Sequence, residues 1–292
     1  MKRAFTLVEI IVTIVILGVL SAGTFVSLKH LYLRSAKSKA LSDLSFTSQI
    51  VIDQIAALLY ERVPATVIGS KTDGSFLPIS NIYGGDYKIL QWIGTSVEAY
   101  KSRAYSGFID LDGSNKNTKT VVSYDFNASL IDALHVDKFG SGSIANQDIA
   151  LIFAGSFDDA SLVASDDFNS SFGWANNGAN LTYTFTATNN NITFITQPKE
   201  IYEKYYLVDS AYAIARGVDV NTSLDPNSLY LFYNFRPWKN QKFTDGNYAK
   251  LAEDVISFQA GVMNNNLYFN FSTKKNIRGG NSVNISKEKV VF

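Results

Sequence analysis

The chain has 292 residues, with 26 basic and 26 acidic side chains, 46% hydrophobic residues and no cysteine. This length allows a globular domain with a real core, while the lack of cysteine excludes a disulfide framework, thiolate metal ligands and a thiol nucleophile. Six basic residues and one acid lie in residues 1–40, which leaves 20 basic and 25 acidic residues, or about −5, in residues 41–292. A mildly acidic domain argues against electrostatically driven binding of nucleic acid.

The first predicted element is an apolar helix near the N-terminus. Residues 10–28 carry no charge, and as an α-helix they span roughly 28 Å, close to the thickness of one hydrocarbon core. A cleaved secretory signal peptide is the alternative interpretation, with small residues near positions 20–23 as its cleavage site. A retained membrane helix is favoured because the helical pattern continues beyond that point.

The continuation is visible in apolar residues that recur at spacings of three, four and seven, which mark one face of a helix. These residues are Leu33, Ala40, Leu41, Leu44, Val51, Ile52, Ile55, Leu58 and Leu59. No proline occurs before Pro64, which is a natural stop signal. We therefore predict a single helix over residues 5–63, apolar all round in its first half and amphipathic in its second half.

A single acid, Glu9, lies at the start of the apolar run. A carboxylate inside hydrocarbon costs several kcal/mol unless it is paired, so such a residue is a functional candidate by default. The alternative is that Glu9 lies near the membrane interface and extends its carboxylate towards water. The chemistry of this one residue leaves both interpretations open.

The residues around Glu9 resemble the class III signal of type IV pilins and type II secretion pseudopilins. The resemblance rests on the basic pair Lys2 and Arg3, the small Ala4, and the sequence FTLVE from Phe5 to Glu9 ahead of the long apolar run. It implies that a prepilin peptidase recognises the basic pair, cleaves between Ala4 and Phe5, and methylates the new amine of Phe5. The hydrophobic helix is then retained.

The same resemblance implies that Glu9 pairs with the N-terminal amine of a neighbouring subunit in a filament. A buried acid and a buried amine are each costly, and they offset each other only when the subunits are in register. Two features depart from the family pattern, since Ala4 stands where glycine is usual and there is no helix proline near Val26. We expect cleavage to survive, because alanine is the next smallest residue.

The charges that flank the apolar run give a conflicting signal about orientation. Two basic residues precede the run and four follow it within a dozen residues, namely Lys29, Arg34, Lys37 and Lys39. The positive-inside rule alone would favour a periplasmic N-terminus or leave the matter undecided. Because processing of the resembled motif requires a cytoplasmic N-terminus, we expect a single-pass inner-membrane protein with a periplasmic C-terminal domain.

Residues 64–292 alternate short apolar runs with Gly-rich and Asn-rich turns, a pattern that predicts a β-rich domain. A short helix is expected at residues 127–136. The expected strands are residues 89–93, 120–126, 149–153, 181–187, 191–196, 205–208, 210–215, 228–235, 255–262 and 266–272. The fourth and fifth strands, and the last two, are expected to form hairpins. The predicted fold class is α+β, with the long N-terminal helix packed on antiparallel sheet.

The C-terminal part resembles that of the larger minor pilins and pseudopilins, the J-type and W-type subunits. The resemblance rests on the sequence KLAED at residues 250–254, which leads into a strand and a hairpin. The expected organisation is a leader at residues 1–4, a helix at residues 5–63, and a pilin-like domain at residues 64–292. An insertion at about residues 100–200 is a further expectation.

Catalytic signals are weak along the whole chain. The two histidines, His30 and His135, are isolated, so a zinc site and Ser-His-Asp catalysis have little support. We expect His30 to be solvated near the membrane and His135 to lie at the surface or at a helix end. No phosphate-cradling G-x-x-x-x-G-K-[ST] loop occurs. The sequence therefore predicts no enzymatic activity and no organic cofactor.

Calcium is the one metal for which the sequence offers suitable oxygen ligands, and some pseudopilins bind it. The candidate ligands are Asp110, Asp112, Asp158, Asp159, Asp166 and Asp167. The turn that contains the first two misses the EF-hand pattern, because its glycine comes too early and no closing glutamate follows. The alternative is a set of solvated acidic loops.

The function that these features favour is structural. We expect a minor pilin or pseudopilin of a type II secretion system, a type IV pilus or a DNA-uptake filament, lying near the filament tip because so large a domain would crowd a regular shaft. Its expected partners are other minor subunits, the major subunit, the prepilin peptidase and the inner membrane, with no direct nucleic-acid ligand. The alternative is a membrane-anchored periplasmic binding module that recognises a secreted substrate, an adhesion target or DNA.

Overall fold

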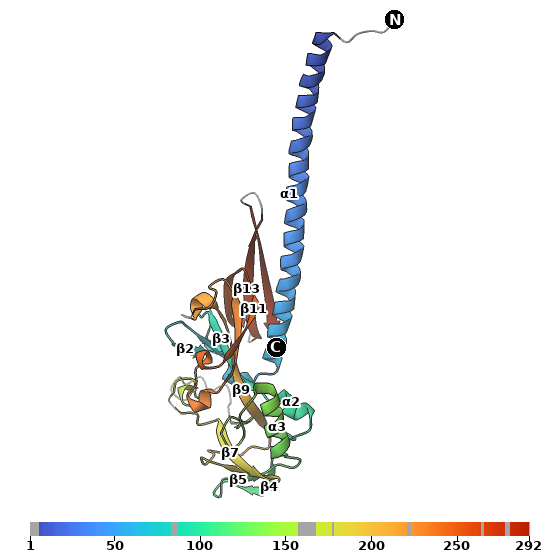
Figure 1. Ribbon diagram of the computed structural model, residues 1–292. Coiled ribbons are helices and arrows are strands. Elements are labelled where there is room, and N and C mark those ends of the chain that lie inside the picture. The colour runs from blue at the N-terminus through green and yellow to red at the C-terminus, as the bar shows by residue number, and fades with distance from the viewer. Residues whose placement is uncertain are drawn as a thin grey trace.

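The computed structural model describes residues 6–82, 87–156, 168–176, 178–220, 223–263, 266–277 and 281–291. One long N-terminal helix projects from a β-rich domain (Figure 1). The strand pairings in this domain are antiparallel. The predicted α+β class is therefore confirmed.

The long helix α1 (Leu7–Tyr60) contains 54 residues in one unbroken element. It ends three residues before the predicted limit, because the following backbone leaves the helix to meet a strand. Val63 N donates to Ile93 O at 2.9 Å, and Arg62 forms an isolated bridge with Gly94. A residue that precedes proline is disfavoured in helical conformation, so Pro64 reinforces this exit.

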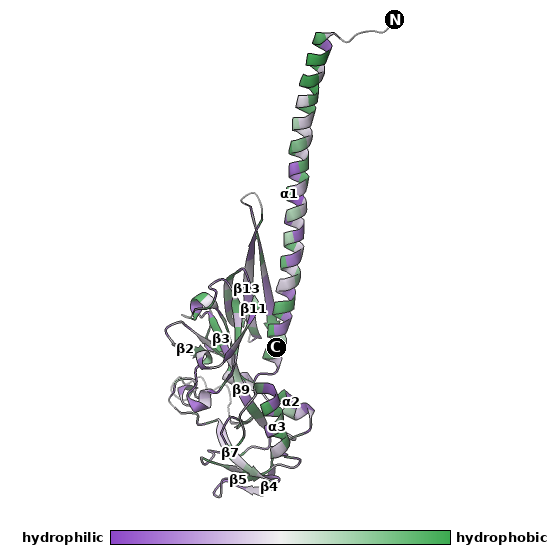
Figure 2. Cartoon of the chain, viewed as in Figure 1, coloured by the Kyte–Doolittle hydropathy of each residue, from purple (hydrophilic) through white to green (hydrophobic). Residues whose placement is uncertain are grey.

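The two halves of α1 differ in burial, as predicted. Side chains 7–32 are all exposed, and Figure 2 shows this part of the helix as largely apolar. The second half buries one stripe against the domain, consisting of Ala40, Leu44, Ser48, Val51, Ile52, Ile55, Ala56 and Leu59. The spacing of that stripe is the spacing of one helical face. The chain therefore covers only half of its longest apolar element.

Short helices and turns connect the remaining elements. The α-helices are α2 (Val97–Lys101) and α3 (Ala128–Phe139). The 3-10 helices are η1 (Pro64–Thr66), η2 (Ile79–Asn81), η3 (Gly217–Asp219), η4 (Pro237–Lys239) and η5 (Phe243–Asp245). Helix α3 confirms the expected helix at 127–136 and extends it by one turn, because Asn127 caps its start and Gly140, in left-handed conformation, ends it.

The strands form two sheets. They are β1 (Ile68–Ser70), β2 (Phe76–Pro78), β3 (Ile89–Thr95), β4 (Asp110–Asn115), β5 (Thr120–Val122), β6 (Ala150–Phe153), β7 (Tyr183–Thr188), β8 (Asn191–Phe194), β9 (Tyr205–Arg216), β10 (Leu229–Phe235), β11 (Asn247–Ala252), β12 (Val255–Met263), β13 (Asn266–Asn276) and β14 (Ser282–Val291). The larger sheet follows the order β2-β1-β3-β9-β6-β7-β8-β5-β4, with β10 and β11 branching from β9. The smaller sheet follows the order β12-β13-β14.

The predicted strands are recovered with shifted ends. The expected hairpins at β7–β8 and β12–β13 are confirmed by their pairing. The two strands expected at 205–208 and 210–215 are one continuous strand, β9, whose residues are almost all buried. The strand expected at 120–126 ends at Val122, and residues 112–115, expected as a turn, belong to β4. The sequence patterns missed β1, β2, β4, β11 and β14.

Three main apolar cores hold the domain together. The first lies between α1 and the two sheets and includes Ile55, Trp92 and Phe269. The second covers the middle of the large sheet. The third is enclosed by α2, α3, β5, β7 and β8, together with parts of β6 and β9, and β4 flanks it through its pairing with β5. We call this third part the distal lobe, because it lies beyond the C-terminal end of α1 (Figure 1).

Candidate functional site

The start of α1 is organised by a reciprocal cap between Thr6 and Glu9. Thr6 N and Thr6 Oγ1 each donate to Glu9 Oε2 at 3.0 Å, and Glu9 N donates to Thr6 Oγ1 at 3.3 Å. This is a capping box, which satisfies backbone donors that the first helical turn leaves open. A carboxylate at this end is also favoured by the helix dipole. Glu9 is therefore held at the N-terminal tip of the helix.

The other residues of the predicted processing signal, Lys2, Arg3, Ala4 and Phe5, lie outside the described residues. The described chain begins at Thr6, the second residue after the predicted cleavage point. Of the predicted signal residues, the structure therefore describes Glu9. Its carboxylate contacts the backbone nitrogen of the residue that follows Phe5.

The apolar part of α1 has the properties of a membrane-spanning helix. It is long and apolar enough to cross a bilayer, and its apolar residues are not buried against any part of the chain that the structure describes. Three of its hydroxyls, those of Thr13, Thr24 and Ser27, bond to the helix's own carbonyl groups, for example Thr13 Oγ1 donating to Glu9 O at 2.6 Å and Ser27 Oγ donating to Gly23 O at 3.1 Å. Such internal pairing suits a helix in lipid, where water cannot satisfy polar groups.

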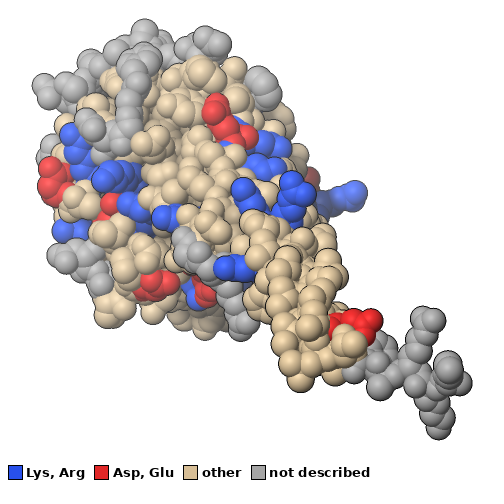
Figure 3. Space-filling view, turned by 90° about the horizontal axis from the view of Figure 1, so that it is seen from above, with Lys and Arg blue, Asp and Glu red and all other residues tan. Residues whose placement is uncertain are grey.

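Charge is distributed unevenly along the exposed helix. Seen from above in Figure 3, the protruding helix is an uncharged column with one acidic group near its outer end, and Glu9 is the only acid in residues 7–28. Lys29, Arg34, Lys37 and Lys39 are all exposed on the part that follows the apolar run. The hydrophobic segment is thus bounded by Glu9 at one end and by cations at the other.

The second half of α1 is fixed to the small sheet by polar contacts as well as by apolar packing. Ser48 Oγ and Thr273 Oγ1 share a buried hydrogen bond of 3.3 Å. Lys289 Nζ lies 3.2 Å from Asp53 Oδ1, and Lys287 Nζ donates to Gln49 Oε1 at 3.2 Å. These contacts orient the exposed helix relative to the domain.

Only two of the acidic calcium candidates fall within the described residues. Asp110 Oδ1 accepts hydrogen bonds from Asp112 N at 3.1 Å and Gly113 N at 3.2 Å, and Tyr124 Oη donates to Asp110 Oδ2 at 3.0 Å. The other candidates, Asp158, Asp159, Asp166 and Asp167, lie outside the described residues. In the described part of the chain, three or more acidic or histidine side chains do not gather in a metal-binding arrangement.

The expected surface position of His135 is wrong. Its side chain is buried on α3, and Arg236 Nη2 donates to His135 Nε2 at 3.1 Å, since a guanidinium can only donate. Burial, reinforced by the adjacent Arg236 charge, lowers the pKa of His135 to about 4. Asp148 completes the cluster, with Oδ1 2.8 Å from Lys239 Nζ and 3.4 Å from Arg236 Nε. This cluster joins α3 to the turn that follows β10.

A second charged cluster in the distal lobe was not predicted from the sequence. Lys138 Nζ lies 3.0 Å from Glu98 Oε2 and 3.3 Å from Asp209 Oδ2, and the Asp209 side chain is only 2% exposed. The three residues come from α3, α2 and β9, which are far apart in the chain. Their individual positions in the sequence carry no signal that brings them together.

The comparisons with known proteins agree with the N-terminal geometry. Residues 1–25 match the family model described as the prokaryotic N-terminal methylation motif. No curated protein and no solved structure gives a significant match. The motif and the exposed apolar helix together support a pilin-type N-terminal signal followed by a membrane anchor.

Proposed function

We propose that this protein is a minor pilin or pseudopilin, a structural subunit of a filament of the type II secretion, type IV pilus or DNA-uptake kind. A prepilin peptidase recognises Lys2 and Arg3, cleaves between Ala4 and Phe5 and methylates Phe5. The mature chain remains in the inner membrane through α1, with its domain in the periplasm. In this proposal the protein has no catalytic role.

The observation that carries the proposal is the division of α1 into two unlike halves behind the matched motif. The second half is packed into the domain, whereas the first half is apolar and exposed along residues 7–32. An apolar surface of this kind requires lipid or other apolar helices as its surroundings. A filament subunit has both surroundings in turn, because its apolar helix lies in lipid before assembly and among neighbouring helices afterwards.

Glu9 supplies the register of assembly in this proposal. Its carboxylate lies at the helix tip, beside the backbone nitrogen of Thr6, the residue that follows the proposed new N-terminus in sequence. In a bundle of helices, an acid and an amine inside hydrocarbon offset each other's cost only when they meet. Pairing with the amine of a neighbouring subunit would thus favour one axial offset between subunits.

A position at the filament tip is supported by the shape of the domain. The distal lobe extends past the C-terminal end of α1 (Figure 1), into the space where the next subunit of a continuous shaft would stack. The partners in this proposal are other minor subunits and the major subunit below it. Calcium binding stays a minor part of the proposal, resting on the acidic residues Asp110, Asp112, Asp158, Asp159, Asp166 and Asp167.

The test is the N-terminal sequence and intact mass of membrane-extracted protein, from cells with and without the prepilin peptidase. A peptidase-dependent start at methylated Phe5 is the expected result. A chain that still starts at Met1 in the presence of the peptidase would contradict processing. A start near Gly23 would instead identify a secretory signal peptide, and the filament proposal would fail.

A further inference from the structure

Two adjoining hollows lie on the side of the distal lobe. The larger has a volume of about 1130 Å³ and is lined by residues from α2, the start of α3 and the β7–β8 turn. The smaller, of about 360 Å³, extends from it to the C-terminal end of α1. Both are lined by Tyr100, Tyr105 and Ser106, so they form one continuous surface, which we call the lobe groove.

Aromatic rings are exposed along the groove. Tyr60, Tyr100 and Phe108 are 59%, 58% and 49% exposed, although large aromatic side chains usually dominate cores. Tyr100 rests edge-on against the buried Tyr105 ring, with centroids 5.8 Å apart. Lys204 Nζ lies 5.7 Å from the centroid of Phe108. Two of the three rings are thus supported from within the lobe and offer their outer surfaces to a ligand.

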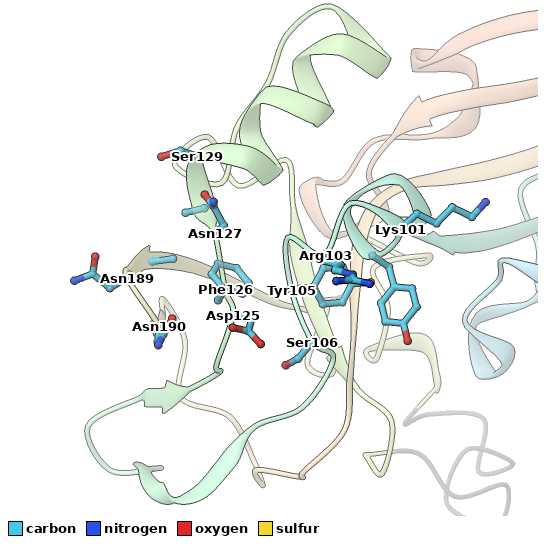
Figure 4. Close-up of a pocket in the computed structure, with 13 residues that line it drawn as sticks. Lys101, Arg103, Tyr105, Ser106, Asp125, Phe126, Asn127, Ser129, Asn189 and Asn190 are labelled. Carbon is cyan, nitrogen blue, oxygen red and sulfur yellow. The ribbon is translucent and has the colours of Figure 1, made fainter.

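Amide and hydroxyl groups line the larger hollow. In Figure 4, Asn189 and Asn190 lie on one side and Arg103 on the other, with Ser106 and Asp125 between them and Asn127 above. Asparagine side chains both donate and accept hydrogen bonds, and the serine hydroxyl does the same. A wide hollow with such a lining suits a ligand that is rich in hydroxyl groups better than an apolar ligand.

The charges of the groove favour an anion. Among the described residues that line the two hollows, four are cationic, namely Arg62, Lys101, Arg103 and Lys204, and one is acidic, namely Asp125. The rest of the domain is mildly acidic. The groove is therefore a local cationic surface on a mildly acidic domain.

Arg103 lies in a backbone conformation that glycine usually occupies. Arg103 N donates to Tyr100 O and Ala104 N donates to Ala99 O, the two hydrogen bonds of a Schellman motif at the end of α2. Arg103 occupies the left-handed position of that motif with φ 55°. Glycine is usual there because a Cβ atom is disfavoured in this conformation, and strain of this kind concentrates at functional sites.

We propose that the lobe groove binds an acidic oligosaccharide, in which hydroxyl groups alternate with uronate carboxylates. Arg103 provides a fork of N–H donors that matches a carboxylate, the asparagines bond to hydroxyls, and Tyr100 packs against the apolar face of a sugar ring. Nucleic acid is less suitable, because a polyphosphate needs a dense run of cations. This binding extends the alternative expected from the sequence, a membrane-anchored periplasmic binding module. It does not depend on how the N-terminus is processed.

The test uses the full chain in detergent and measures binding by isothermal titration calorimetry. The probes are oligogalacturonate, alginate oligomers and hyaluronan fragments, with methyl-esterified oligogalacturonate as the uncharged match and a single-stranded DNA oligomer as the competing polyanion. We expect binding to at least one uronate probe and, for oligogalacturonate, at least tenfold weaker binding of its ester. Binding to none of the three, equal binding of acid and ester, or tighter binding of DNA would each overturn the proposal.

Two glycine substitutions separate recognition from backbone strain. Lys119 also has positive φ, 58°, but lies in the β4–β5 turn outside the groove. R103G and K119G each remove one cation and one strained position, and K119G also removes the exposed hydrogen bond from Lys119 Nζ to Ile195 O at 3.2 Å, so both variants should melt close to the temperature of the parent chain. Only R103G should weaken uronate binding, by about tenfold or more. Equal affinity in R103G and the parent chain would show that Arg103 does not recognise the ligand.

A third variant tests the aromatic surface. Tyr100→Ala removes an exposed ring without touching a charged group, and it should weaken binding about tenfold while the melting temperature changes little. Unchanged binding in Tyr100→Ala would exclude the ring-packing part of the proposal. These experiments measure a property of the distal lobe only. Failure of the binding proposal would therefore leave the proposals of N-terminal processing and filament assembly unaffected. Failure of processing would likewise not alter binding by the groove.

Discussion

At the residue scale, Glu9 has two roles that can be tested separately. It caps the start of α1, and it is proposed to pair with the N-terminal amine of a neighbouring subunit. Glu9→Ala should reduce incorporation into filaments at least tenfold, because a neighbouring amine would then enter the helix bundle unpaired. Loss of the cap should lower helix stability only slightly, because the capping hydrogen bonds are exposed to solvent. The measurement is the amount of subunit in sheared filaments relative to the amount in membranes.

Thr6→Ala is the matched control for Glu9→Ala. It removes the hydroxyl that bonds to Glu9 Oε2 and accepts from Glu9 N, while the carboxylate remains. Incorporation should therefore stay close to that of the parent chain. An equal loss in both variants would mean that the cap, and not the charge, determines assembly.

His135 makes the stability of the distal lobe depend on pH. Its folded pKa of about 4 lies below the ordinary value of 6.5, so the unfolded chain takes up the proton first as the pH falls. The stabilisation is complete above about pH 6.5 and is lost progressively towards pH 4. The loss should reach about 3 kcal/mol, because each pH unit between the folded and unfolded pKa values contributes about 1.4 kcal/mol.

Urea midpoints between pH 7 and pH 4 measure this dependence. The slope above pH 4 should flatten in His135→Gln, because that variant has no imidazole to protonate, and it should persist in the control His30→Gln, since His30 is exposed on α1. A parent chain with the same midpoint at pH 7 and pH 4.5 would contradict the assignment. The neutral, buried imidazole beside Arg236 is the physical origin of the effect.

At the scale of elements, the Lys138 cluster fixes α3 to β9. Lys138→Met would leave the Asp209 carboxylate, 2% exposed, without its cation, and should lower the free energy of unfolding by about 3 kcal/mol. The double variant Lys138→Met with Asp209→Asn should recover part of this loss, because no buried charge is then left unpaired. Chemical denaturation of the single and double variants measures the coupling, and strict additivity would argue against a direct interaction.

Elements with regularly spaced apolar residues on one face could be predicted from the sequence. Elements that are stabilised by polar partners distant in the chain could not. Strand β9 and the β7–β8 and β12–β13 hairpins follow apolar patterns and turn residues. Strand β14 was missed because Lys287 and Lys289 interrupt its apolar alternation, and those lysines bond to Gln49 and Asp53 of α1. Strand β4 was missed because its residues resemble a turn and contact their own backbone.

At the scale of the whole molecule, the proposed orientation is open to a direct test. The chain has no cysteine, so a single introduced thiol reports its own location. Asn117→Cys is at an exposed position between β4 and β5 in the distal lobe. A membrane-impermeant maleimide should label it in intact spheroplasts at least tenfold more than the cysteine-free parent chain. Labelling only after the membrane is dissolved would place the domain in the cytoplasm.

The sequence by itself determined the N-terminal features of this protein. The processing motif, the apolar span and the amphipathic continuation of α1 depend on the succession of neighbouring residues and on the helical period. Both can be recognised directly in the sequence. The lobe groove, the burial of His135 and the Lys138 cluster were decided only by tertiary structure. Each of these joins residues from elements that are distant in the chain, and only the folding of the sheets brings those elements into contact.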